Sequence, residues 1–357
     1  MRNKIALVMV HTSPLEQAGI GDAGGMNIYV IESAKRMAAV GVEVDIYTRK
    51  ISEEQPEIVE FEKGIRIIHL DLAIGTKKEE IPALIPALAE ELKKKIQGKG
   101  YQVIHSHYWI SGKVAMPAAK EYSIPLVHTM HTMARVKNLA LAEGESPEPM
   151  IRVQGESQIV EAANALIANT DAEAASLVSL YDACPDHVRV VAPGVDLYSF
   201  TSEGKDARQS LNLDPKKLII SFVGRIQPHK GPEVLIRAIN EMLTHNPELR
   251  AKLQVLITGG ASGVKSNEDI RLRELVNWLK LEDVINFLEP ISREKLPDLY
   301  RASDLVCVPS YSESFGLVAL EAQACGTPVV ASAVGGLRTA VADGISGVLV
   351  DGHDPRA

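Results

Sequence analysis

The segment that decides the fold is LIISFVGRIQPHKGP, which runs from Leu218 to Pro232. Its first six residues are mostly β-branched, aromatic or aliphatic, which predicts a buried strand that ends at Val223. A loop with Arg225 and Lys230 follows directly, and Pro232 suits the first turn of a helix because its missing N–H is not needed there. A strand that passes through a short loop into a helix is the building unit of a doubly wound α/β sheet.

Short apolar runs alternate with longer stretches of helical period along the whole chain. Between the first two runs, Asn27–Val40 has apolar residues along one helical face, and Gly41 is placed to end that helix. The alternation pauses near Pro193–Asp196, so we predict two doubly wound, Rossmann-like parallel-sheet domains, residues 1–194 and 195–357. The predicted strands are Ile5–Val10, Val42–Thr48, Ile65–Leu70, Val103–His107, Leu126–Thr129, Ala165–Asn169, Val188–Ala192, Leu218–Val223, Leu253–Thr258, Val284–Phe287, Leu305–Val308, Pro328–Ala331 and Gly347–Val350.

The composition is that of an ordinary globular protein: 357 residues, of which 46% are hydrophobic. Lys and Arg total 38 against 46 Asp and Glu, and the resulting net charge of -8 opposes binding to nucleic acid. An anionic ligand therefore needs a local basic pocket. The three cysteines, Cys184, Cys307 and Cys325, form no CxxC pair, which favours a reducing, cytoplasmic location. No apolar run reaches the roughly 18 residues of a membrane span, and the first run is too short for a signal peptide.

The loop Gly19–Gly24 matches G-x-G-x-x-G, and Asp45 follows about twenty residues later, which is typical of nicotinamide-dinucleotide binding. In that fingerprint, however, the strand turns directly into the glycine loop. Here eight residues, one of them a proline, separate Val10 from Gly19. The spacing favours a long glycine loop that leads into a helix N-terminus able to accept an anion.

Two further motifs follow predicted strands of the second half. Arg225 and Lys230 flank a helix N-terminus, and two cations at that position are suited to hold a diphosphate. Glu313 is expected in a loop and Glu321 on the next helix, eight residues on. Their carboxylates are suited to accept hydrogen bonds from sugar hydroxyls.

Together these motifs resemble the retaining glycosyltransferases of family 4, which have the GT-B fold. The resemblance rests on Asp22–Asn27, on Val223–Arg225 with Lys230, and on the E-x7-E signature of Glu313 and Glu321. Four segments resemble the members of the family that use an inositol phosphate acceptor: His11–Pro14, His105–Trp109, His128–Thr132 and Lys137-Asn138. The resemblance implies transfer of N-acetylglucosamine from UDP-N-acetylglucosamine to 1D-myo-inositol 3-phosphate, the first step of mycothiol biosynthesis.

The same resemblance implies a role for individual positions. The UDP-sugar donor would be bound by Gly25, Arg225, Lys230, Ile291, Glu313 and Glu321, and His131 would lie beside the reacting sugar, so that His131, Arg225, Lys230 and Glu313 form the catalytic set. The acceptor would be bound by His11, Asp22, Ala23, Gly24, Gly25, Met26, Asn27, Lys78, Tyr108, Thr132 and Arg152. Lys78 and Arg152 would supply positive charge for one phosphate, and Tyr108 and Thr132 would add hydroxyl donors.

Other expectations also come from the resemblance. No organic cofactor is implied, but a magnesium ion is, held largely by backbone oxygens around Tyr300, Arg301 and Ser303 together with Thr327. A homodimer is implied as well. Family members continue past the equivalent of Asp351–Pro355 with helices that pack on the first domain, so we expect an incomplete second domain.

Three other functions remain open at this point. One is a family-4 enzyme with a different sugar-nucleotide donor or a different acceptor, such as a sugar phosphate or a lipid-linked sugar. Another is a hydrolysing UDP-sugar epimerase, which shares the fold class. The third is a UDP-sugar binding protein without catalytic activity.

Overall fold

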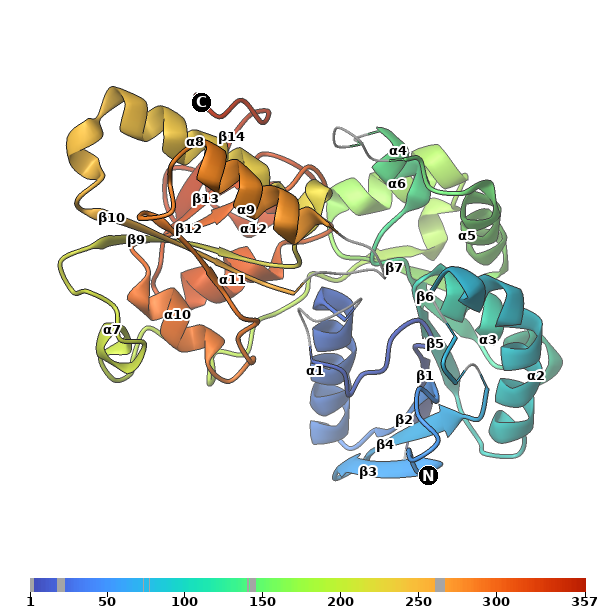
Figure 1. The fold of residues 1–357 in the computed structure, drawn as a ribbon. Helices are drawn as coiled ribbons and strands as arrows, with labels where there is room; N and C mark the ends of the chain where they lie inside the picture. Colours follow the sequence, from blue (N-terminus) through green and yellow to red (C-terminus); the bar gives the residue numbers. More distant parts are fainter. Residues whose placement is uncertain are drawn as a thin grey trace. The chain divides into compact units, whose positions relative to one another are not determined.

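The computed structural model describes residues 3–17, 23–72, 74–76, 78–139, 141, 146–260 and 267–357, apart from the side chains of residues 78 and 79. The described chain forms two α/β units, blue to green and yellow to red in Figure 1. The first holds Ala23–Leu139 and Pro147–Ala192 together with the first strand, and the second is built on Pro193–Ala357. Each unit has its own sheet and its own core.

The sheet of the first unit has eight strands within the described residues, in the order β3-β4-β2-β1-β5-β6-β7-β8. Its neighbouring strands are parallel except for the pair of β3 with β4. The strands are β1 (Lys4–Val8), β2 (Glu43–Arg49), β3 (Ile58–Glu62), β4 (Ile65–Leu70), β5 (Val103–His107), β6 (Leu126–Thr129), β7 (Ala165–Ala168) and β8 (Val188–Val190). The helices are α1 (Gly25–Ala39), α2 (Ile85–Ile96), α3 (Trp109–Glu121), α4 (Ala134–Leu139), α5 (Met150–Ala162) and α6 (Asp171–Tyr181), with 3-10 turns η1 (Lys78–Leu84) and η2 (Pro185–His187).

The central strand β1 shows why this sheet is covered on both faces. Alternate side chains of a strand point to opposite faces. Ala6 and Val8 pack on the side of α2 and α3, while Leu7 and Met9 pack on the side of α1, and all four are fully buried. Figure 1 shows α1 on one side of the sheet and α2 and α3 on the other. A strand buried on both faces is apolar throughout, as in doubly wound folds.

The sheet of the second unit has six parallel strands within the described residues, in the order β11-β10-β9-β12-β13-β14. Helices α8 and α9 pack on one face, and α10 and α11 on the other (Figure 1). The strands are β9 (Leu218–Val223), β10 (Leu253–Thr258), β11 (Ile285–Leu288), β12 (Leu305–Val308), β13 (Val329–Ser332) and β14 (Gly347–Val350). The helices are α7 (Ala207–Ser210), α8 (Pro232–His245), α9 (Glu268–Trp278), α10 (Leu296–Ala302), α11 (Leu317–Ala324) and α12 (Leu337–Ala340), with 3-10 turns η3 (Pro228–Lys230) and η4 (Pro247–Leu249).

One strand is absent from the prediction. β3 (Ile58–Glu62) alternates exposed and half-buried residues, carries Glu60 and Glu62, and pairs antiparallel with β4 at the edge of the first sheet. Charged residues are common on edge strands, where they oppose pairing with another chain, but they remove the apolar run by which buried strands are predicted. The first sheet is therefore mixed at this edge, and the parallel arrangement that the sequence predicts is confirmed for its other strand pairs.

Candidate active site

The predicted donor residues of the second unit follow the carboxyl ends of its strands, where ligands bind in doubly wound sheets. Arg225 and Lys230 lie between β9 and α8. Gly231, which precedes α8, has φ +71°, and a Cβ there would lie 2.0 Å from the carbonyl oxygen of Pro309. Only glycine permits this close approach. The loop after β9 thus packs on the loop after β12, which carries Glu313.

This packing brings two predicted residues into contact. The Nζ atom of Lys230 lies 2.6 Å from Oε2 of Glu313, and both side chains are about a fifth exposed. Both groups are partly exposed, so a ligand can reach them. The ammonium is suited to bind a phosphate, and the carboxylate is suited to accept hydrogen bonds from hydroxyl groups. The pair therefore has the chemistry expected of a sugar-nucleotide site.

Glu321 lies on α11, as predicted, but it is almost fully buried, with 4% of its surface exposed. Its Oε1 accepts a hydrogen bond from Nη1 of Arg293 at 2.7 Å, and its Oε2 accepts one from the hydroxyl of Tyr300 at 3.1 Å. Burial and the charge of Glu321 together raise the pKa of Tyr300 well above its usual value, so this hydroxyl stays protonated and donates. Ile291, two residues before Arg293, is partly buried beside Leu299.

In the first unit, Asn27 fixes the start of α1. Its side-chain amide donates to the carbonyl of Ser13 at 2.8 Å, and its Oδ1 accepts hydrogen bonds from the Gly24 backbone N–H at 3.0 Å and from the Thr12 hydroxyl at 3.2 Å. Asn27 and Ala23 are buried, whereas Gly25 is exposed at the first turn of the helix. Gly24 and Met26 are half-buried, and the predicted Asp22 lies outside the described residues. Asn27 therefore ties Gly24, at the start of α1, to Thr12 and Ser13 through its side-chain amide.

Histidines gather where β5 and β6 end. Nδ1 of His107 lies 3.0 Å from Nε2 of His131, and Nε2 of His105 lies 2.9 Å from the Thr129 hydroxyl. The ring of Tyr29 contacts His131 edge-on. His131 is half-buried and has φ +60°, a backbone conformation that costs a non-glycine residue about 1 kcal/mol or more and is enriched at functional sites.

Burial sets the charge of this cluster. It lowers the pKa of His131 to about 3 and that of His105 to about 4. Burial and the neighbouring histidines lower the pKa of His107 well below its usual value. At neutral pH these rings are therefore uncharged, and they act as neutral hydrogen-bonding groups.

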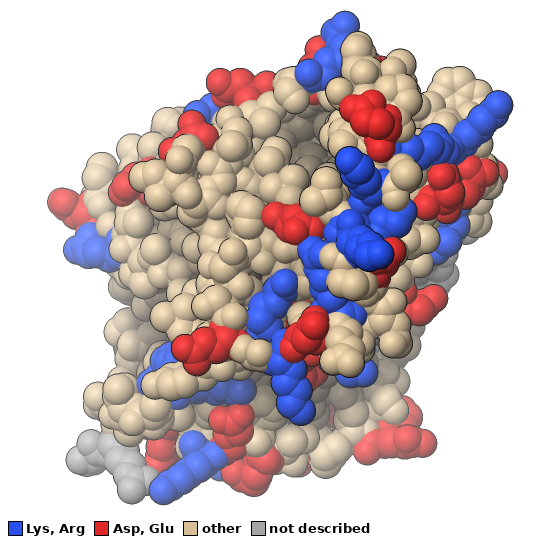
Figure 2. All heavy atoms as spheres, turned by 90° about the vertical axis from the view of Figure 1, so that its left-hand side faces the viewer, with Lys and Arg blue, Asp and Glu red and all other residues tan. Residues whose placement is uncertain are grey.

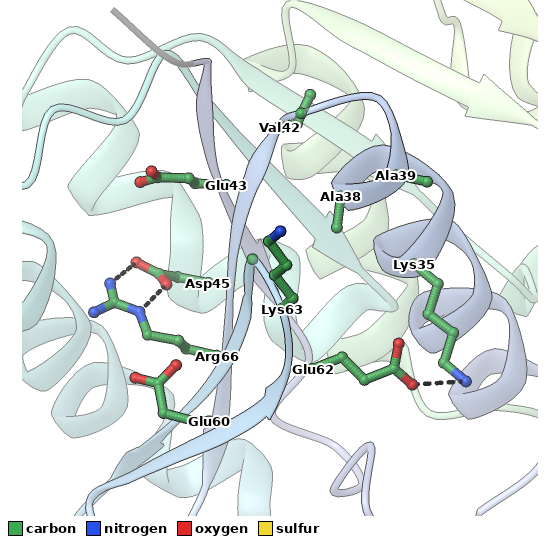
Figure 3. Close-up of a pocket in the computed structure, with 12 residues that line it drawn as sticks. Lys35, Ala38, Ala39, Val42, Glu43, Asp45, Glu60, Glu62, Lys63 and Arg66 are labelled. Carbon is green, nitrogen blue, oxygen red and sulfur yellow. Dashed lines mark hydrogen bonds and ion pairs between the residues drawn. The ribbon is translucent and has the colours of Figure 1, made fainter.

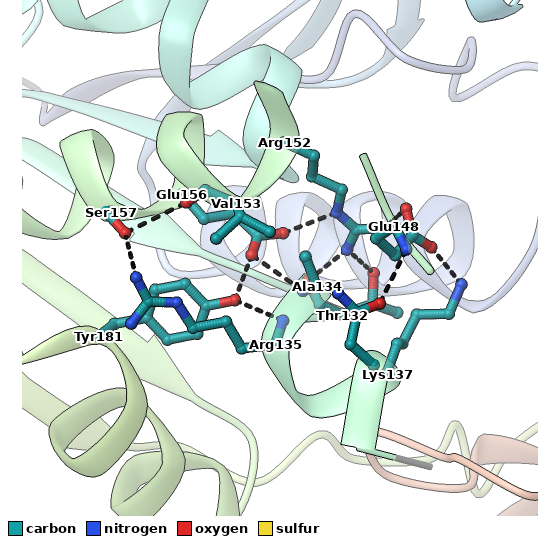
Figure 4. Close-up of polar contacts among 11 residues, drawn as sticks. Thr132, Ala134, Arg135, Lys137, Glu148, Arg152, Val153, Glu156, Ser157 and Tyr181 are labelled. Atoms are coloured by element: carbon teal, nitrogen blue, oxygen red, sulfur yellow. Dashed lines mark hydrogen bonds and ion pairs between the residues drawn. The ribbon is translucent and has the colours of Figure 1, made fainter. Parts of the chain in front are cut away.

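Four predicted acceptor residues come together beside this cluster. The ring of Tyr108, also at a positive φ of 71°, packs on His11 with 4.6 Å between ring centroids, and the guanidinium of Arg152 lies 5.0 Å from the Tyr108 centroid. Nη2 of Arg152 donates to both the hydroxyl and the carbonyl of Thr132, at 2.9 and 3.0 Å. Two carboxylates, Glu148 and Glu156, also bind this guanidinium (Figure 4). Lys78, which was also predicted to bind the acceptor phosphate, has a side chain outside the described part of the chain.

The two units match two family models in succession. The model described as Glycosyltransferase Family 4 matches residues 23–198, and the one described as Glycosyl transferases group 1 matches residues 204–357. A D-inositol 3-phosphate glycosyltransferase of Actinosynnema mirum is 51% identical over 98% of this chain and 85% of that protein. A protein of the same name from Kribbella flavida is 51% identical over 98% of this chain and 84% of its own length. The chain belongs to glycosyltransferase family 4.

Solved structures agree on the fold. A sucrose-phosphate synthase from Thermosynechococcus elongatus is 34% identical to this chain and superposes with a TM-score of 0.91, over 100% of this chain and 88% of the other. An Anabaena protein determined with UDP and glucose superposes with a TM-score of 0.75 over 100% of this chain and 87% of the other, but at 20% identity it supports the fold alone. The chain is thus a family-4 glycosyltransferase with the GT-B fold.

Several side chains that contact the predicted site residues were not themselves predicted as site residues. Arg293 contacts Glu321 from a loop between β11 and α10, and His107 contacts His131 from the end of β5. Glu156 lies four residues after Arg152 on α5, a spacing that places acid and base on the same helical face, whereas Glu148 precedes the helix. That spacing is the one signal by which Glu156 could have been found.

The positions predicted for magnesium lie close together but are engaged with one another. The hydroxyl of Thr327 donates to the Tyr300 carbonyl at 2.5 Å, and the backbone N–H of Ser303 donates to the same carbonyl at 3.1 Å. The Arg301 guanidinium pairs with Asp298, and the described residues contain no cluster of three His, Cys, Asp or Glu side chains suited to a metal. These donors do not fit a magnesium ion as they stand, because divalent magnesium favours carboxylate and water oxygens. Magnesium stays a prediction, and the roles of Arg225, Lys230 and Glu313 do not depend on it.

The acid of the dinucleotide alternative has a structural role. Asp45 is 2% exposed, accepts two hydrogen bonds from Arg66 at 2.7 and 2.8 Å, and also binds Tyr101 and Lys4. Burial acts to raise the pKa of Asp45, but hydrogen bonds from Arg66 and Tyr101 outweigh it, so the pKa lies below its usual value. Asp45 and Arg66 border an open hollow of about 840 Å³ between α1 and the β3–β4 hairpin (Figure 3). The start of β2 lines this hollow, so the hollow lies near the amino ends of the strands. The predicted site lies at their carboxyl ends, on the opposite edge of the sheet.

Charged side chains on the outside of the molecule are largely mixed in sign. On the face drawn in Figure 2, Lys and Arg form a band with Asp and Glu beside it. In the second unit, ion pairs join Arg250 to Asp283 and Arg271 to both Glu233 and Glu268. Among the described residues, no helix combines the length and the apolar character that crossing a membrane requires.

Proposed function

We propose that this glycosyltransferase transfers N-acetylglucosamine from UDP-N-acetylglucosamine to 1D-myo-inositol 3-phosphate and retains the anomeric configuration. The main support for inositol 3-phosphate as the acceptor is the roughly 50% identity, over nearly the whole chain, to proteins named D-inositol 3-phosphate glycosyltransferase. The contacts of Arg152 with Thr132 and Tyr108 support it, since a guanidinium beside hydroxyl groups is suited to a phosphate.

In the proposed reaction the protein positions its substrates and stabilises charge. The bond between the sugar C1 and the diphosphate breaks, the acceptor hydroxyl oxygen bonds to C1, and its proton passes to an oxygen of the departing UDP. Arg225 and Lys230 would balance the charge that develops on this leaving group. Glu313, which lies beside Lys230, would accept hydrogen bonds from the sugar hydroxyls and so orient the reacting carbon.

His131 would take part as a neutral group. Because burial lowers its pKa to about 3, it would carry no charge at the pH of catalysis and would form a hydrogen bond to the sugar without attracting the diphosphate. Its contact with His107 at 3.0 Å limits rotation of the ring.

A second acceptor has its own support. The sucrose-phosphate synthase that shares 34% identity and a TM-score of 0.91 is named for a phosphorylated sugar. A sugar phosphate acceptor would use the same arginine and hydroxyl groups, and only the remainder of the acceptor would differ.

The test is release of UDP from UDP-N-acetylglucosamine with inositol 3-phosphate, with fructose 6-phosphate, and with no acceptor. Release only with inositol 3-phosphate is the expected result. Release with fructose 6-phosphate alone would favour the second acceptor, and release without any acceptor would favour an epimerase. UDP binding without release in any arm, repeated with UDP-glucose, would indicate a binding protein.

A further inference from the structure

The two carboxylates that bind Arg152 differ in what else holds them. Glu156 is fully buried and receives Nε of Arg152 at 2.7 Å. Its other oxygen accepts hydrogen bonds from the Ala134 backbone N–H at 2.9 Å and from the Tyr181 hydroxyl. Because both of its oxygens are engaged and it is fully buried, Glu156 is a permanent counter-ion of the buried arginine.

Among the residues that the structure describes, the Glu148 carboxylate contacts two cations. Its Oε2 lies 2.9 Å from Nη1 of Arg152, and its Oε1 pairs with Nζ of Lys137. The side chain is 18% exposed and extends from the segment before α5, whose backbone N–H at Glu148 is fixed by Oδ1 of Asn138 at 2.8 Å. Figure 4 shows the carboxylate between the two cations. This carboxylate therefore makes the contacts that a phosphate oxygen would make at the same place.

The charge balance explains the consequence. Arg152 and Lys137 carry two positive charges, which Glu148 and Glu156 neutralise in this structure. A phosphate that approached Arg152 with Glu148 in place would meet a neutral cluster and a carboxylate of its own sign. Once Glu148 turns toward solvent, the same cluster has a net positive charge and two donors directed at the vacated position.

We propose that Glu148 is an internal anion that occupies the acceptor phosphate subsite and sets its affinity for anions. This rests on the proposed function for the identity of the acceptor, but not for the existence of the anion subsite. Every anion must displace the carboxylate, so the affinity of each anion for this subsite is reduced by the same factor. A free phosphate, which has no other contacts, then binds only at high concentration. An acceptor that makes additional contacts elsewhere still binds at lower concentration.

The experiment compares wild type with Glu148→Gln, which keeps the size of the side chain and removes its charge. Binding of inorganic phosphate is measured by calorimetry, and the KM for inositol 3-phosphate by UDP release. We expect both the phosphate Kd and the acceptor KM to fall by about tenfold, the size of one partly exposed charge-assisted hydrogen bond, while kcat and the donor KM do not change. Agreement of the two factors is the signature of a common displacement step.

Glu161→Gln is the matched control, because Glu161 is an exposed glutamate on α5, the helix that follows Glu148. It should change neither constant. A Glu148→Gln protein that binds phosphate no better than wild type, or whose acceptor KM alone improves, would overturn the proposal. If Glu148→Gln does not fold, Glu148→Ala is tested by phosphate binding in the same way. Absence of turnover with inositol 3-phosphate would refute the proposed function, and the phosphate measurement would still decide the role of Glu148.

Discussion

Lys230 and Glu313, two of the predicted donor residues, form an ion pair at 2.6 Å. The Glu313 carboxylate fixes the position of the Lys230 ammonium, which is partly exposed. The ammonium can therefore exchange its contact with the carboxylate for a contact with a diphosphate. A leaving group gains negative charge in the transition state, and a fixed cation stabilises that state more than the bound substrate.

We predict that Lys230→Ala lowers kcat by about 100-fold at saturating substrates, a loss typical of one removed charge-stabilising group. The measurement is steady-state UDP release. Lys252→Ala removes an exposed lysine of the same unit and serves as the control. An unchanged kcat in Lys230→Ala would exclude this lysine from the mechanism.

Arg152 gives a second prediction, specific to the acceptor. Arg152→Lys keeps a positive charge opposite Glu156 but loses the planar fork that contacts Thr132 and Glu148 at the same time. The KM for the phosphorylated acceptor should rise at least about tenfold while the donor KM stays within about twofold. Equal effects on the two substrates would contradict an acceptor role. Lysine is preferred to alanine here because removing the charge would leave the buried Glu156 carboxylate without its counter-ion, at a cost of about 3–5 kcal/mol in stability.

At the scale of elements, the carboxyl ends of β5 and β6 present neutral histidines to the interior. Burial lowers the pKa of His105 and His131 to about 4 and about 3, against about 6.5 in an unfolded chain. Between those values the unfolded state binds more protons, so the folded state loses stability as pH falls. Glu173 acts in the opposite sense, because burial raises its pKa to about 7 and its ionisation opposes folding as pH rises.

We therefore predict that the free energy of unfolding is flat above about pH 7 and decreases from about pH 6.5 to pH 4. Urea denaturation at a series of pH values measures this slope. His105→Gln places an amide near the ring nitrogen that contacts Thr129, so it keeps the hydrogen bond and removes one titrating group. Its slope should be smaller than that of wild type. An identical slope would show that His105 does not titrate in this range.

The turn after β13 determines where Glu313 lies. Gly335 has φ +45°, and a Cβ at that position would lie 2.2 Å from the Glu313 carbonyl oxygen, which also accepts the Gly336 N–H at 2.9 Å. Gly344 also has a positive φ, +72°, but nothing lies within 4 Å of its Cβ position. An alanine at either position has an unfavourable φ, but only an alanine at 335 would also displace the backbone of Glu313. Comparing the two substitutions therefore separates these two effects.

Gly335→Ala should lower kcat/KM for the donor by about tenfold or more and destabilise the fold, since the backbone at Glu313 must move. Gly344→Ala should cost only about 1 kcal/mol of stability, the price of a left-handed conformation, with normal kinetics. Urea denaturation and donor kinetics measure both effects. Normal donor kinetics in Gly335→Ala would mean that the placement of Glu313 is not limiting.

Elements that are buried on both faces were the ones that the sequence predicted well. β9 and β10 have the predicted bounds, because an apolar run between glycine or polar residues is unambiguous when both faces of a sheet are covered. β3 escaped prediction because its charged edge lacks such a run. The loop position of Glu313 and the helical position of Glu321 were confirmed, whereas the contacts of Arg293 and Glu148 depend on loop conformation, which leaves no periodic pattern in the sequence.

At the scale of the whole molecule, an acidic protein is proposed to bind two anions. The net charge of -8 opposes both ligands at long range. Binding must therefore come from cations placed locally, and these lie in different units: Arg152 in the first and Lys230 in the second. Each unit has its own buried core, so each cation is anchored independently of the other.

This division predicts a crossed pattern of ligand-induced stabilisation. A ligand at about 100 times its Kd adds about 2.7 kcal/mol to the state that binds it, which corresponds to a rise of about 5 °C in unfolding temperature for a unit of this size. UDP should stabilise wild type and Arg152→Lys alike but Lys230→Ala less, and inositol 3-phosphate should stabilise wild type and Lys230→Ala alike but Arg152→Lys less. Thermal unfolding with each ligand in turn measures all six combinations. If either variant loses both responses, recognition of the two anions is not divided between the units, and a cation assigned to one ligand also serves the other.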